Sequence, residues 1–299
     1  MQTNQTNRLL RFWRPAVQLL RPYQWVKSLF VLLGLLFSHA WSELALRNSV
    51  LLATVAFALA ASAVYVFNDL NDREQDRAHP QKSKRPLAAG TVRVRDALWL
   101  GLLCLFAALF LAYQAAPLVC LIIVAYLLLN LAYSLALKHI VLLDVFVIAT
   151  GFMLRILAGT LGVGIAPSHW LLLCGLMLTL LLGFAKRRAE LKALAQPSRA
   201  QRKVLAEYDL HLLDQIIAVC AACTIISYGL YTVSAETLLT QGTDHLIYTV
   251  PFVVYGVFRY LFLLHRRTLA DDPSSALLRD RHLLFSCLGW LLSVLLIIF

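Results

Sequence analysis

Long apolar runs separated by short polar segments make up most of this chain. A helix needs about 20 mostly apolar residues to cross a bilayer, and nine runs approach that length. The pattern therefore predicts an all-α polytopic membrane protein, with nine transmembrane helices forming a single domain over residues 1–299. The nine predicted crossings are residues 25–43, 48–68, 96–115, 117–137, 141–163, 168–186, 211–234, 246–265 and 281–299.

Three polar segments stand outside these runs. Residues 1–20 are polar and then basic and amphipathic, which is typical of a helix that lies in the membrane interface. They lack the pattern of a cleavable signal peptide, because no small-residue cleavage site follows an apolar core. Residues 69–95 and 187–210 are the two connections long enough to fold over a site as caps.

The charge of the chain fits a membrane protein better than a nucleic-acid-binding protein. The net charge is +11, but only 14% of the residues are charged and 60% are hydrophobic. The cations gather in alternate connections, and the opposite connections contain only Arg47. Lysine and arginine concentrate on the cytoplasmic side of membrane proteins. We therefore expect a cytoplasmic N-terminus, a site on the cytoplasmic side of the membrane, and no nucleic-acid partner.

The most informative polar stretch is YVFNDLNDREQDRAHPQKSKRPLAAGT, residues 65–91. Asn68, Asp72 and Asp76 are spaced four apart, so on a helix they share one face, and Asp69 borders that face. Carboxylate and amide oxygens are hard ligands suited to Mg²⁺, with Mn²⁺ as the alternative ion. We interpret these four residues as metal ligands, and Asp72 and Asp76 as the catalytic carboxylates.

Basic residues follow this acidic segment directly. Lysine and arginine side chains suit phosphate oxygens. Metal-binding carboxylates beside phosphate-binding cations, at the mouth of a membrane helix, predict a site for a pyrophosphate ester. The candidates for the donor's phosphates are Arg77, Lys82 and Arg85.

Three further polar groups, Tyr133, Lys138 and Asp144, lie around the connection between the fourth and fifth predicted helices, in YSLALKHIVLLDVFVIATGFMLR. Arg155 lies deeper in the fifth helix. Asp144 and Arg155 are eleven apart and share a helix face, separated by roughly 16 Å along the axis. Ionisable residues in a membrane helix usually face a cavity or a partner. A structural ion pair of Asp144 with a cation from another helix is the alternative to a substrate contact.

Three more cations lie at predicted helix ends. Lys186 and Arg187 close the sixth helix in GFAKRRAEL, and Lys27 opens the first in RPYQWVKS. Each is either a substrate-phosphate ligand or an anchor at a helix end. Arg21, in the same segment as Lys27, is interpreted as an interfacial anchor.

The stretch NDLNDREQDRAHPQKSKRPLAAG resembles the first aspartate-rich motif of the UbiA superfamily of intramembrane prenyltransferases. RPYQWVKS, HPQKSKRPLAAG and the pair YSLALKHIVLLDVFVIATGFMLRILAG and GFAKRRAEL resemble one branch, the decaprenyl-phosphate phosphoribosyltransferases. These segments cover most of the first two thirds of the chain. One departure stands out, because prenyltransferases of this superfamily often carry a second motif, DxxxD, whereas here Ile148 stands four after Asp144.

The resemblance implies a nine-helix bundle and Mg²⁺-dependent transfer of a 5-phosphoribosyl group from phosphoribosyl pyrophosphate to a polyprenyl phosphate, releasing pyrophosphate. In that branch the product feeds cell-wall biosynthesis. The implied partners are the two substrates and the membrane, and a homo-oligomer is compatible with the sequence. Candidates for the 5-phosphate or the acceptor phosphate are Lys27, Lys138, Lys186 and Arg187; Tyr133, Asp144 and Arg155 are further substrate-binding candidates.

Two other functions remain open from the sequence. An aromatic prenyltransferase of a quinone or haem pathway, with a polyprenyl diphosphate donor, would share the first motif. The missing DxxxD and the basic segments count against it. A non-catalytic membrane carrier or lipid-binding subunit is the third reading. Four oxygen ligands beside a cation cluster, without matching groups on the outer side, count against a transport path.

Overall fold

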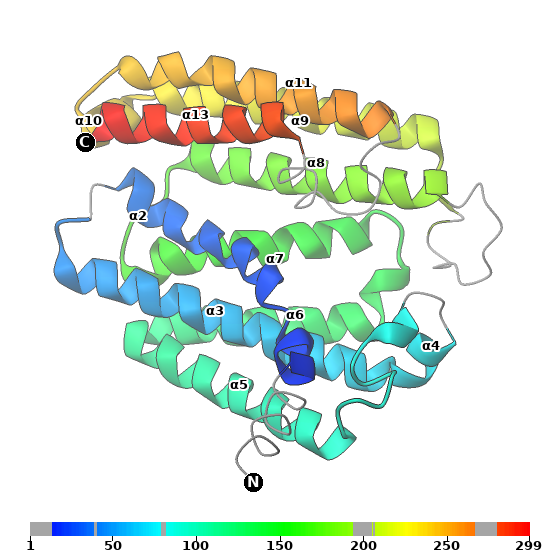
Figure 1. The fold of residues 1–299 in the computed structure, drawn as a ribbon. Helices are drawn as coiled ribbons and strands as arrows, with labels where there is room; N and C mark the ends of the chain where they lie inside the picture. Colours follow the sequence, from blue (N-terminus) through cyan, green and yellow to red (C-terminus); the bar gives the residue numbers. More distant parts are fainter. Residues whose placement is uncertain (1–13, 39–40, 79–81, 194–204, 206, 267–279) are drawn as a thin grey trace, which may run out of the picture. The chain divides into compact units, whose positions relative to one another are not determined.

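The computed structural model describes residues 14–38, 41–78, 82–193, 205, 207–266 and 280–299, and within these residues all regular elements are helices (Figure 1). Eight helices in this part of the chain are long and apolar enough to cross a membrane. The prediction of an all-α membrane protein is therefore confirmed. Residues 1–13 of the predicted interfacial segment 1–20 lie outside the described residues, as do residues 79–81 and half of the predicted cap 187–210.

The eight helices correspond to eight of the nine predicted crossings. Helix α8 differs most, since it runs well past the predicted end at residue 186. The long elements are α3 (Leu44–Asn71), α5 (Val94–Ala115), α6 (Pro117–Leu135), α7 (Leu143–Gly159) with η4 (Leu161–Val163), α8 (His169–Ala193), α9 (Leu210–Val233), η6 (His245–Thr249) with α11 (Val250–His265), and α13 (Arg281–Ile298). The short elements are α4 (Arg73–Arg77), η2 (Lys82–Lys84), η3 (Leu137–His139) and α10 (Ala235–Gln241).

The first predicted crossing, residues 25–43, takes a different form. Its residues form a 3₁₀-helix, η1 (Pro22–Leu32), followed by the five-residue α2 (Leu33–Phe37). Hydropathy alone cannot separate a 3₁₀-helix from an α-helix, because both bury apolar side chains. The expected count of nine α-helical crossings is therefore not confirmed within the described residues.

Contacts divide the chain into two compact units. The first takes the described residues of Met1–Leu36, Ala40–Ser134 and Leu154–Ile165. The second takes those of Phe37–His39, Leu135–Met153 and Ala166–Phe299.

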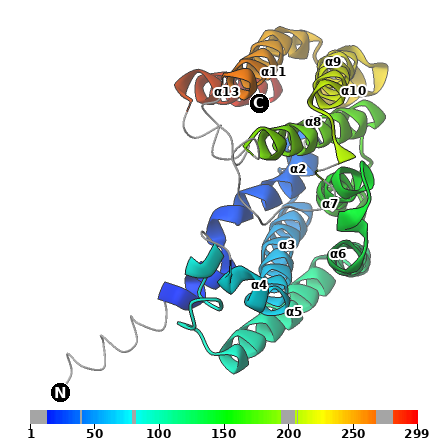
Figure 2. The ribbon, with the colours of Figure 1, turned by 90° about the vertical axis from the view of Figure 1, so that its right-hand side faces the viewer.

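Helices α3 and α5 lie side by side in the first unit (Figures 1 and 2). The face of α3 is built from small buried residues, including Ala53, Ala56 and Ala60. A Cβ atom added at Gly101 of α5 would lie 3.1 Å from Cγ1 of Val66. Small residues let membrane helices approach closely. This packing fixes α3 along the length that ends in the acidic segment.

Close backbone packing also fixes η1 and α2 in the first unit. A Cβ atom added at Gly159 would lie 1.7 Å from the Val31 carbonyl oxygen. One added at Gly34 would lie 2.0 Å from the Gly159 carbonyl oxygen. Only glycine leaves room for such an approach, so this pair of glycines holds η1 and α2 against the end of α7.

In the second unit α8 packs on α9, and α11 lies beside α13 (Figure 2). Its core includes the buried Leu181, Phe184, Leu213 and Ile217. A Cβ atom added at Gly183 of α8 would lie 2.5 Å from the Val145 side chain of α7. The first turns of α7 therefore pack directly on α8.

Candidate functional site

The acidic segment begins on α3 and continues through a slight break into α4. Asp72 lies between the two helices, yet its N–H donates to the Asn68 carbonyl oxygen at 2.9 Å, and the Asp76 N–H donates to the Asp72 carbonyl oxygen at 2.8 Å. The four-residue repeat of backbone hydrogen bonds thus passes through the break, as the spacing predicted. The side chains nevertheless differ in their partners.

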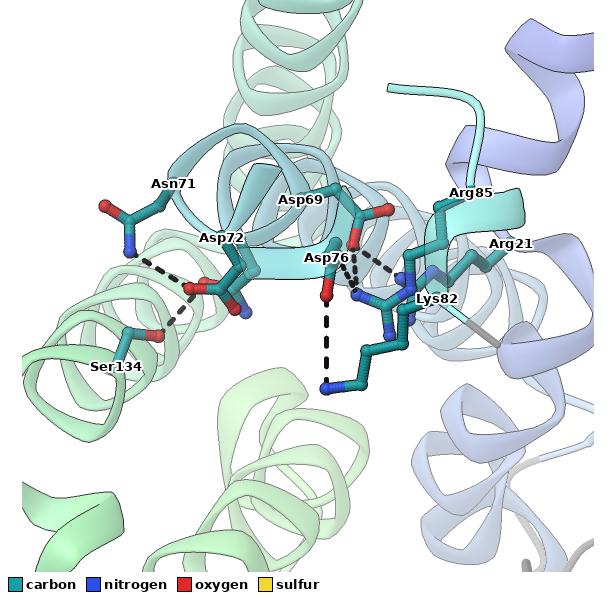
Figure 3. A network of polar contacts seen from close by, with 9 residues as sticks. Arg21, Asp69, Asn71, Asp72, Asp76, Lys82, Arg85 and Ser134 are labelled. Carbon is teal, nitrogen blue, oxygen red and sulfur yellow. Dashed lines mark hydrogen bonds and ion pairs between the residues drawn. The ribbon is translucent and has the colours of Figure 1, made fainter. Parts of the chain in front are cut away.

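Asp69 and Asp76 form a pair, and Arg85 joins them (Figure 3). Both carboxylates are buried. Nη1 of Arg85 lies 3.1 Å from Oδ1 of Asp69 and 2.6 Å from Oδ2 of Asp76. Nζ of Lys82 lies 4.0 Å from Oδ1 of Asp76. Arg85 follows η2, so the chain after α4 folds back and places cations on carboxylates that sequence spacing assigned to a metal.

Asn68 and Asp72 have other partners, and the Asp72 carboxylate lies on the side away from Arg85 (Figure 3). Oδ1 of Asn68 accepts a hydrogen bond from the Ser134 hydroxyl of α6 at 3.0 Å. Oδ1 of Asp72 accepts from the Asn71 amide at 3.2 Å. Asp72 carries a carboxylate that no described cation pairs with.

This division bears on the predicted metal site. Among the described residues, no group of three or more His, Cys, Asp or Glu side chains is arranged to hold a metal ion. The donor set that still fits a hard divalent cation is the Asp72 carboxylate with the Asn68 amide oxygen, because Mg²⁺ commonly binds through one or two protein oxygens and keeps several waters. Metal ligation by all four residues stays a prediction.

Arg21 is the main site residue that sequence reasoning missed. Its Nη2 atom lies 2.6 Å from Oδ1 of Asp69, the same oxygen that Arg85 contacts (Figure 3). Its guanidinium carbon lies 4.9 Å from the centre of the Tyr65 ring. The backbone of Arg21 is left-handed, with φ 53° and ψ 58°, which costs a residue other than glycine about 1–2 kcal/mol. The strained backbone of Arg21 marks it as a site residue, but this strain is visible only in the structure and not in the sequence.

The other cations predicted for the donor phosphates vary in their contacts. Nη1 of Arg77 lies 3.0 Å from the exposed Glu74 carboxylate, and its Nε donates to the Ala88 carbonyl oxygen at 3.4 Å. Lys27, on η1, is half-buried. Tyr133, also half-buried, precedes Ser134 on α6. The structure therefore brings Lys82 and Arg85 to the acidic pair, whereas Arg77 turns toward Glu74.

Arg155 is buried within the first unit, among aromatic rings. Its Nη2 atom donates to the Tyr126 hydroxyl at 3.1 Å. Its guanidinium carbon lies 4.7 Å from the Tyr126 ring centre and 5.4 Å from that of Phe57. Such cation–π contacts stabilise a charge in an apolar setting. Arg155 and Asp144 both lie on α7, but they belong to different units.

The second unit holds its own buried cluster. Oδ2 of Asp144 lies 2.6 Å from Nε of Arg187, and Oδ1 accepts from the Tyr208 hydroxyl at 2.8 Å. Nη1 of Arg187 also lies 2.6 Å from the Glu190 carboxylate. The structural alternative for Asp144, an ion pair with a cation from another helix, is thus confirmed. Substrate contact by Asp144 or Arg187 stays a prediction.

Tyr208 holds the cluster from the segment just before α9. Its hydroxyl accepts from the Leu142 N–H at 2.8 Å, and Leu142 has a left-handed backbone with φ 65°. Burial raises the pKa of the Tyr208 phenol well above its ordinary value, and its hydrogen bond to Asp144 raises it further. The Tyr208 phenol therefore stays protonated at neutral pH and donates to Asp144. No sequence pattern connected it to Asp144.

The remaining predicted cations of the second unit are less enclosed. Lys138, on η3, is half-buried, and Lys186, on α8, is exposed although it precedes the buried Arg187.

Arg259, to which the sequence assigned no role, forms an ion pair at the start of α13. It lies 2.7 Å from Asp280, which also accepts a hydrogen bond from the Leu283 N–H and so caps α13. The Arg259 hydrogen bond lowers the pKa of Asp280.

Comparison with known proteins adds to this geometry. The model of the UbiA prenyltransferase family matches residues 28–288. The decaprenyl-phosphate phosphoribosyltransferase of Mycolicibacterium smegmatis is 32% identical over 288 residues, covering 92% of this chain and 89% of that protein. The decaprenyl-phosphate phosphoribosyltransferase of Mycobacterium tuberculosis (strain CDC 1551 / Oshkosh) is 32% identical over 283 residues, covering 93% of this chain and 92% of that protein. A solved UbiA homolog from Archaeoglobus fulgidus bound to GPP and Mg²⁺ has the same fold, with TM-score 0.72 at 19% identity, covering 95% of this chain and 99% of that one.

Proposed function

This chain belongs to the UbiA prenyltransferase family, and from that premise we propose that it transfers a 5-phosphoribosyl group from phosphoribosyl pyrophosphate to the phosphate of a polyprenyl lipid. Pyrophosphate is the other product. The observation that carries the proposal is the 32% identity with phosphoribosyltransferases over nearly their whole length. The excess of cations at the acidic segment supports it, because both substrates are phosphate esters.

The acceptor needs little activation in this reaction. A polyprenyl phosphate is already an anionic nucleophile at neutral pH. One of its oxygens forms the new bond to C1 of the ribose as the bond from C1 to the pyrophosphate oxygen breaks, so no proton has to be removed. Cleavage at a sugar C1 passes through an oxocarbenium-like state. Catalysis then consists of positioning the substrates and stabilising charge.

The cations near Asp69 and Asp76 are suited to the donor. Arg85 and Lys82 contact these carboxylates but are 30% and 46% exposed, so they can also reach a ligand. Guanidinium groups bind phosphate oxygens in pairs of parallel hydrogen bonds. We assign Arg85 and Lys82 to the pyrophosphate of the donor, with Arg77 and Lys27 as further ligands of its phosphates.

We further propose that Asn68 and Asp72 hold Mg²⁺, with Mn²⁺ as the alternative. Metal ligation by Asp69 and Asp76 stays a prediction, because both carboxylates contact arginines. The Mg²⁺-bound UbiA homolog supports a metal in this fold. When bound, the ion would neutralise charge on the departing pyrophosphate. Asp72 and Asp76 keep their proposed catalytic role. The hydrogen bond from the Ser134 hydroxyl holds the Asn68 amide oxygen in place as a metal ligand.

For the lipid phosphate we propose Lys138 and Lys186, the less enclosed cations of the second unit. Tyr133, in the first unit, is proposed to contact the ribose or a phosphate. Arg187, Asp144 and the buried Arg155 are assigned to positioning the helices that carry these groups. This division rests on their burial and on the partners that surround them.

The membrane topology is proposed on charge and length. Cations concentrated in alternate connections support a cytoplasmic N-terminus and a cytoplasmic site in a bacterial inner membrane. A 3₁₀-helix rises about 2 Å per residue and an α-helix about 1.5 Å, so η1 with α2 reaches roughly 30 Å, the thickness of the hydrocarbon core. On this basis we propose η1 and α2 as the ninth crossing.

The direct test is transfer by the purified protein. Phosphoribosyl pyrophosphate labelled at the 5-phosphate is incubated with decaprenyl phosphate and Mg²⁺, and the lipid is extracted. We expect label in the lipid, none in excess EDTA, and recovery when Mg²⁺ is restored. Full transfer in EDTA would remove the metal from the account. Transfer of a prenyl group from a polyprenyl diphosphate to an aromatic acceptor, with no label in the lipid, would establish the aromatic prenyltransferase instead.

A further inference from the structure

Arg21 lies in a segment that sequence reasoning treated only as a membrane anchor. It follows the helical residues 14–20 and precedes η1, and its left-handed backbone is one of two such conformations outside glycine in the described part of the chain. A strained residue persists only where its surroundings hold it, and such residues gather at functional sites. Contacts with α3 fix the residues on both sides of Arg21 and so maintain its backbone conformation.

The two flanks of Arg21 are fixed by α3. On one side, Leu19 is fully buried against Val66, and the carbonyl oxygen of Leu20 accepts from the Ser62 hydroxyl at 2.9 Å. On the other side, the Trp25 indole N–H donates to the same Ser62 oxygen at 2.9 Å. One serine therefore fixes the chain before and after the strained residue. The guanidinium is presented to the acidic segment from a fixed backbone.

The guanidinium of Arg21 is only partly used by the protein. Nη2 contacts Asp69 at 2.6 Å, and the side chain is 18% exposed. Its Nε and Nη1 atoms have no protein acceptor among the described residues, and the same holds for Nε and Nη2 of Arg85. An arginine has five N–H donors and no acceptor. Two arginines that share one carboxylate oxygen thus keep most of their donors for another partner.

The local charge favours an anion as that partner. Arg21, Lys82 and Arg85 contact the two buried carboxylates of Asp69 and Asp76, which leaves the group with one positive charge in excess. Paired guanidinium groups match the geometry of phosphate oxygens. We propose that Arg21 binds the diphosphate group of a sugar diphosphate at this site, side by side with Arg85, and that Asp69 positions both arginines for it.

This proposal rests on the proposed function for the identity of the donor, but it can be tested without transfer. The probe is inorganic pyrophosphate with Mg²⁺, and its binding to the purified full-length protein is measured by calorimetry. Loss of a hydrogen bond to a charged group weakens binding by roughly tenfold to a hundredfold, and we expect R21Q to show a loss in that range. The matched control is R14Q, which removes an exposed arginine of the same segment and should bind like the unchanged protein.

A second pair of variants separates ligand binding from anchoring. W25F removes the indole donor to Ser62 but keeps the guanidinium, so it should weaken pyrophosphate binding less than twofold if Arg21 is a ligand. R21K keeps the charge without the paired donors and should fall between R21Q and the unchanged protein. Wild-type binding by R21Q, or equal losses in W25F and R21Q, would show that Arg21 serves only as an anchor and overturn the proposal.

Kinetics then separate this proposal from the proposed function. R21Q should raise the KM for phosphoribosyl pyrophosphate about tenfold, the lower end of that range, and change the KM for decaprenyl phosphate less than twofold. If the unchanged protein binds pyrophosphate through Arg21 but does not use phosphoribosyl pyrophosphate, the proposed function fails and the Arg21 site stands. If transfer proceeds and R21Q leaves both KM values unchanged, the Arg21 site fails and the proposed function stands.

Discussion

Each unit of the molecule contains a cluster of carboxylates and arginines, but the two clusters differ in charge balance and exposure. In the first unit three cations contact two buried carboxylates, and the cations are 18–46% exposed. In the second unit Arg187 lies between two carboxylates, Asp144 and Glu190, and is 1% exposed. The first cluster has unused donors at its surface, whereas two of the three nitrogens of the Arg187 guanidinium contact carboxylates.

Similar residues therefore serve two purposes in this molecule. A buried pair is costly to desolvate and is strongly destabilised when one partner is removed, so the second cluster is suited to holding α7 and α8 together. A cluster with excess positive charge and partial exposure is suited to a phosphate ligand. Substitutions in the first cluster should therefore change ligand binding and turnover, and those in the second should change stability.

The largest effect is expected from Asp72→Ala. This residue has no described cation partner and is the carboxylate most available to a metal. Removing it should lower kcat/KM about a thousandfold, the upper range for losing one preorganised electrostatic group, without a change in apparent Tm. The control is Glu74→Ala, which removes an exposed carboxylate from the same segment. Near-normal turnover in Asp72→Ala would remove the proposed metal ligand.

Asp144→Ala should show the opposite profile. It leaves the buried Arg187 with Glu190 alone and the Tyr208 hydroxyl without its acceptor. We expect a loss of about 3 kcal/mol in the free energy of unfolding, measured by denaturant titration in detergent micelles. Binding of Mg²⁺ and pyrophosphate by the folded fraction should be unchanged. A lost pyrophosphate affinity at unchanged stability would place Asp144 in the ligand site.

Tyr208→Phe should have a smaller effect on the same cluster. It removes the donor to Asp144, whose other oxygen keeps Arg187, and the acceptor of the Leu142 N–H, which belongs to an exposed residue. We therefore expect a loss of about 1 kcal/mol, the lower end for a buried group left unpaired. The raised pKa of Tyr208 also predicts a pH dependence. The folded state keeps the phenolic proton that the unfolded state loses near pH 10, so this contribution is complete below that pH and declines above it. Denaturation midpoints from pH 7 to 11 should decline less steeply in the variant.

Lys186→Ala should give the smallest effect. An exposed cation contributes little to stability, so unfolding should be unchanged. If Lys186 binds the lipid phosphate, its loss should raise the KM of decaprenyl phosphate roughly two- to fivefold, the range of a solvent-screened contact, and leave that of phosphoribosyl pyrophosphate unchanged. Unchanged kinetics for both substrates would make Lys186 an anchor at the helix end.

The sequence predicted the membrane helices well because a bilayer imposes one rule, a run of apolar residues of fixed length. It did not predict the helix type at η1, since burial of apolar residues does not choose between a 3₁₀-helix and an α-helix. It predicted the spacing of Asn68, Asp72 and Asp76 on the backbone, because the helical repeat is local. It could not predict that Asp69 and Asp76 would share Arg85, because that contact depends on how the chain folds back after α4.

Contacts between distant segments account for the other omissions. Arg21 and Asp69 are 48 residues apart, and Tyr208 and Asp144 are 64 apart. A single sequence carries no periodicity at such distances, so Arg21 was interpreted as an anchor and Tyr208 was not considered. The signal that remained was chemical. A carboxylate in an apolar helix requires a partner, and this argument correctly anticipated the pairing of Asp144.

The identity of the donor tests the account most directly. Purified protein is given decaprenyl phosphate, Mg²⁺ and phosphoribosyl pyrophosphate carrying one label on the 5-phosphate and a different label on the pyrophosphate. The account predicts that the first label enters the lipid in a one-to-one ratio with the second label released as pyrophosphate. If the extracted lipid contains none of the first label, although the same preparation binds pyrophosphate and Mg²⁺, the proposed transfer is contradicted.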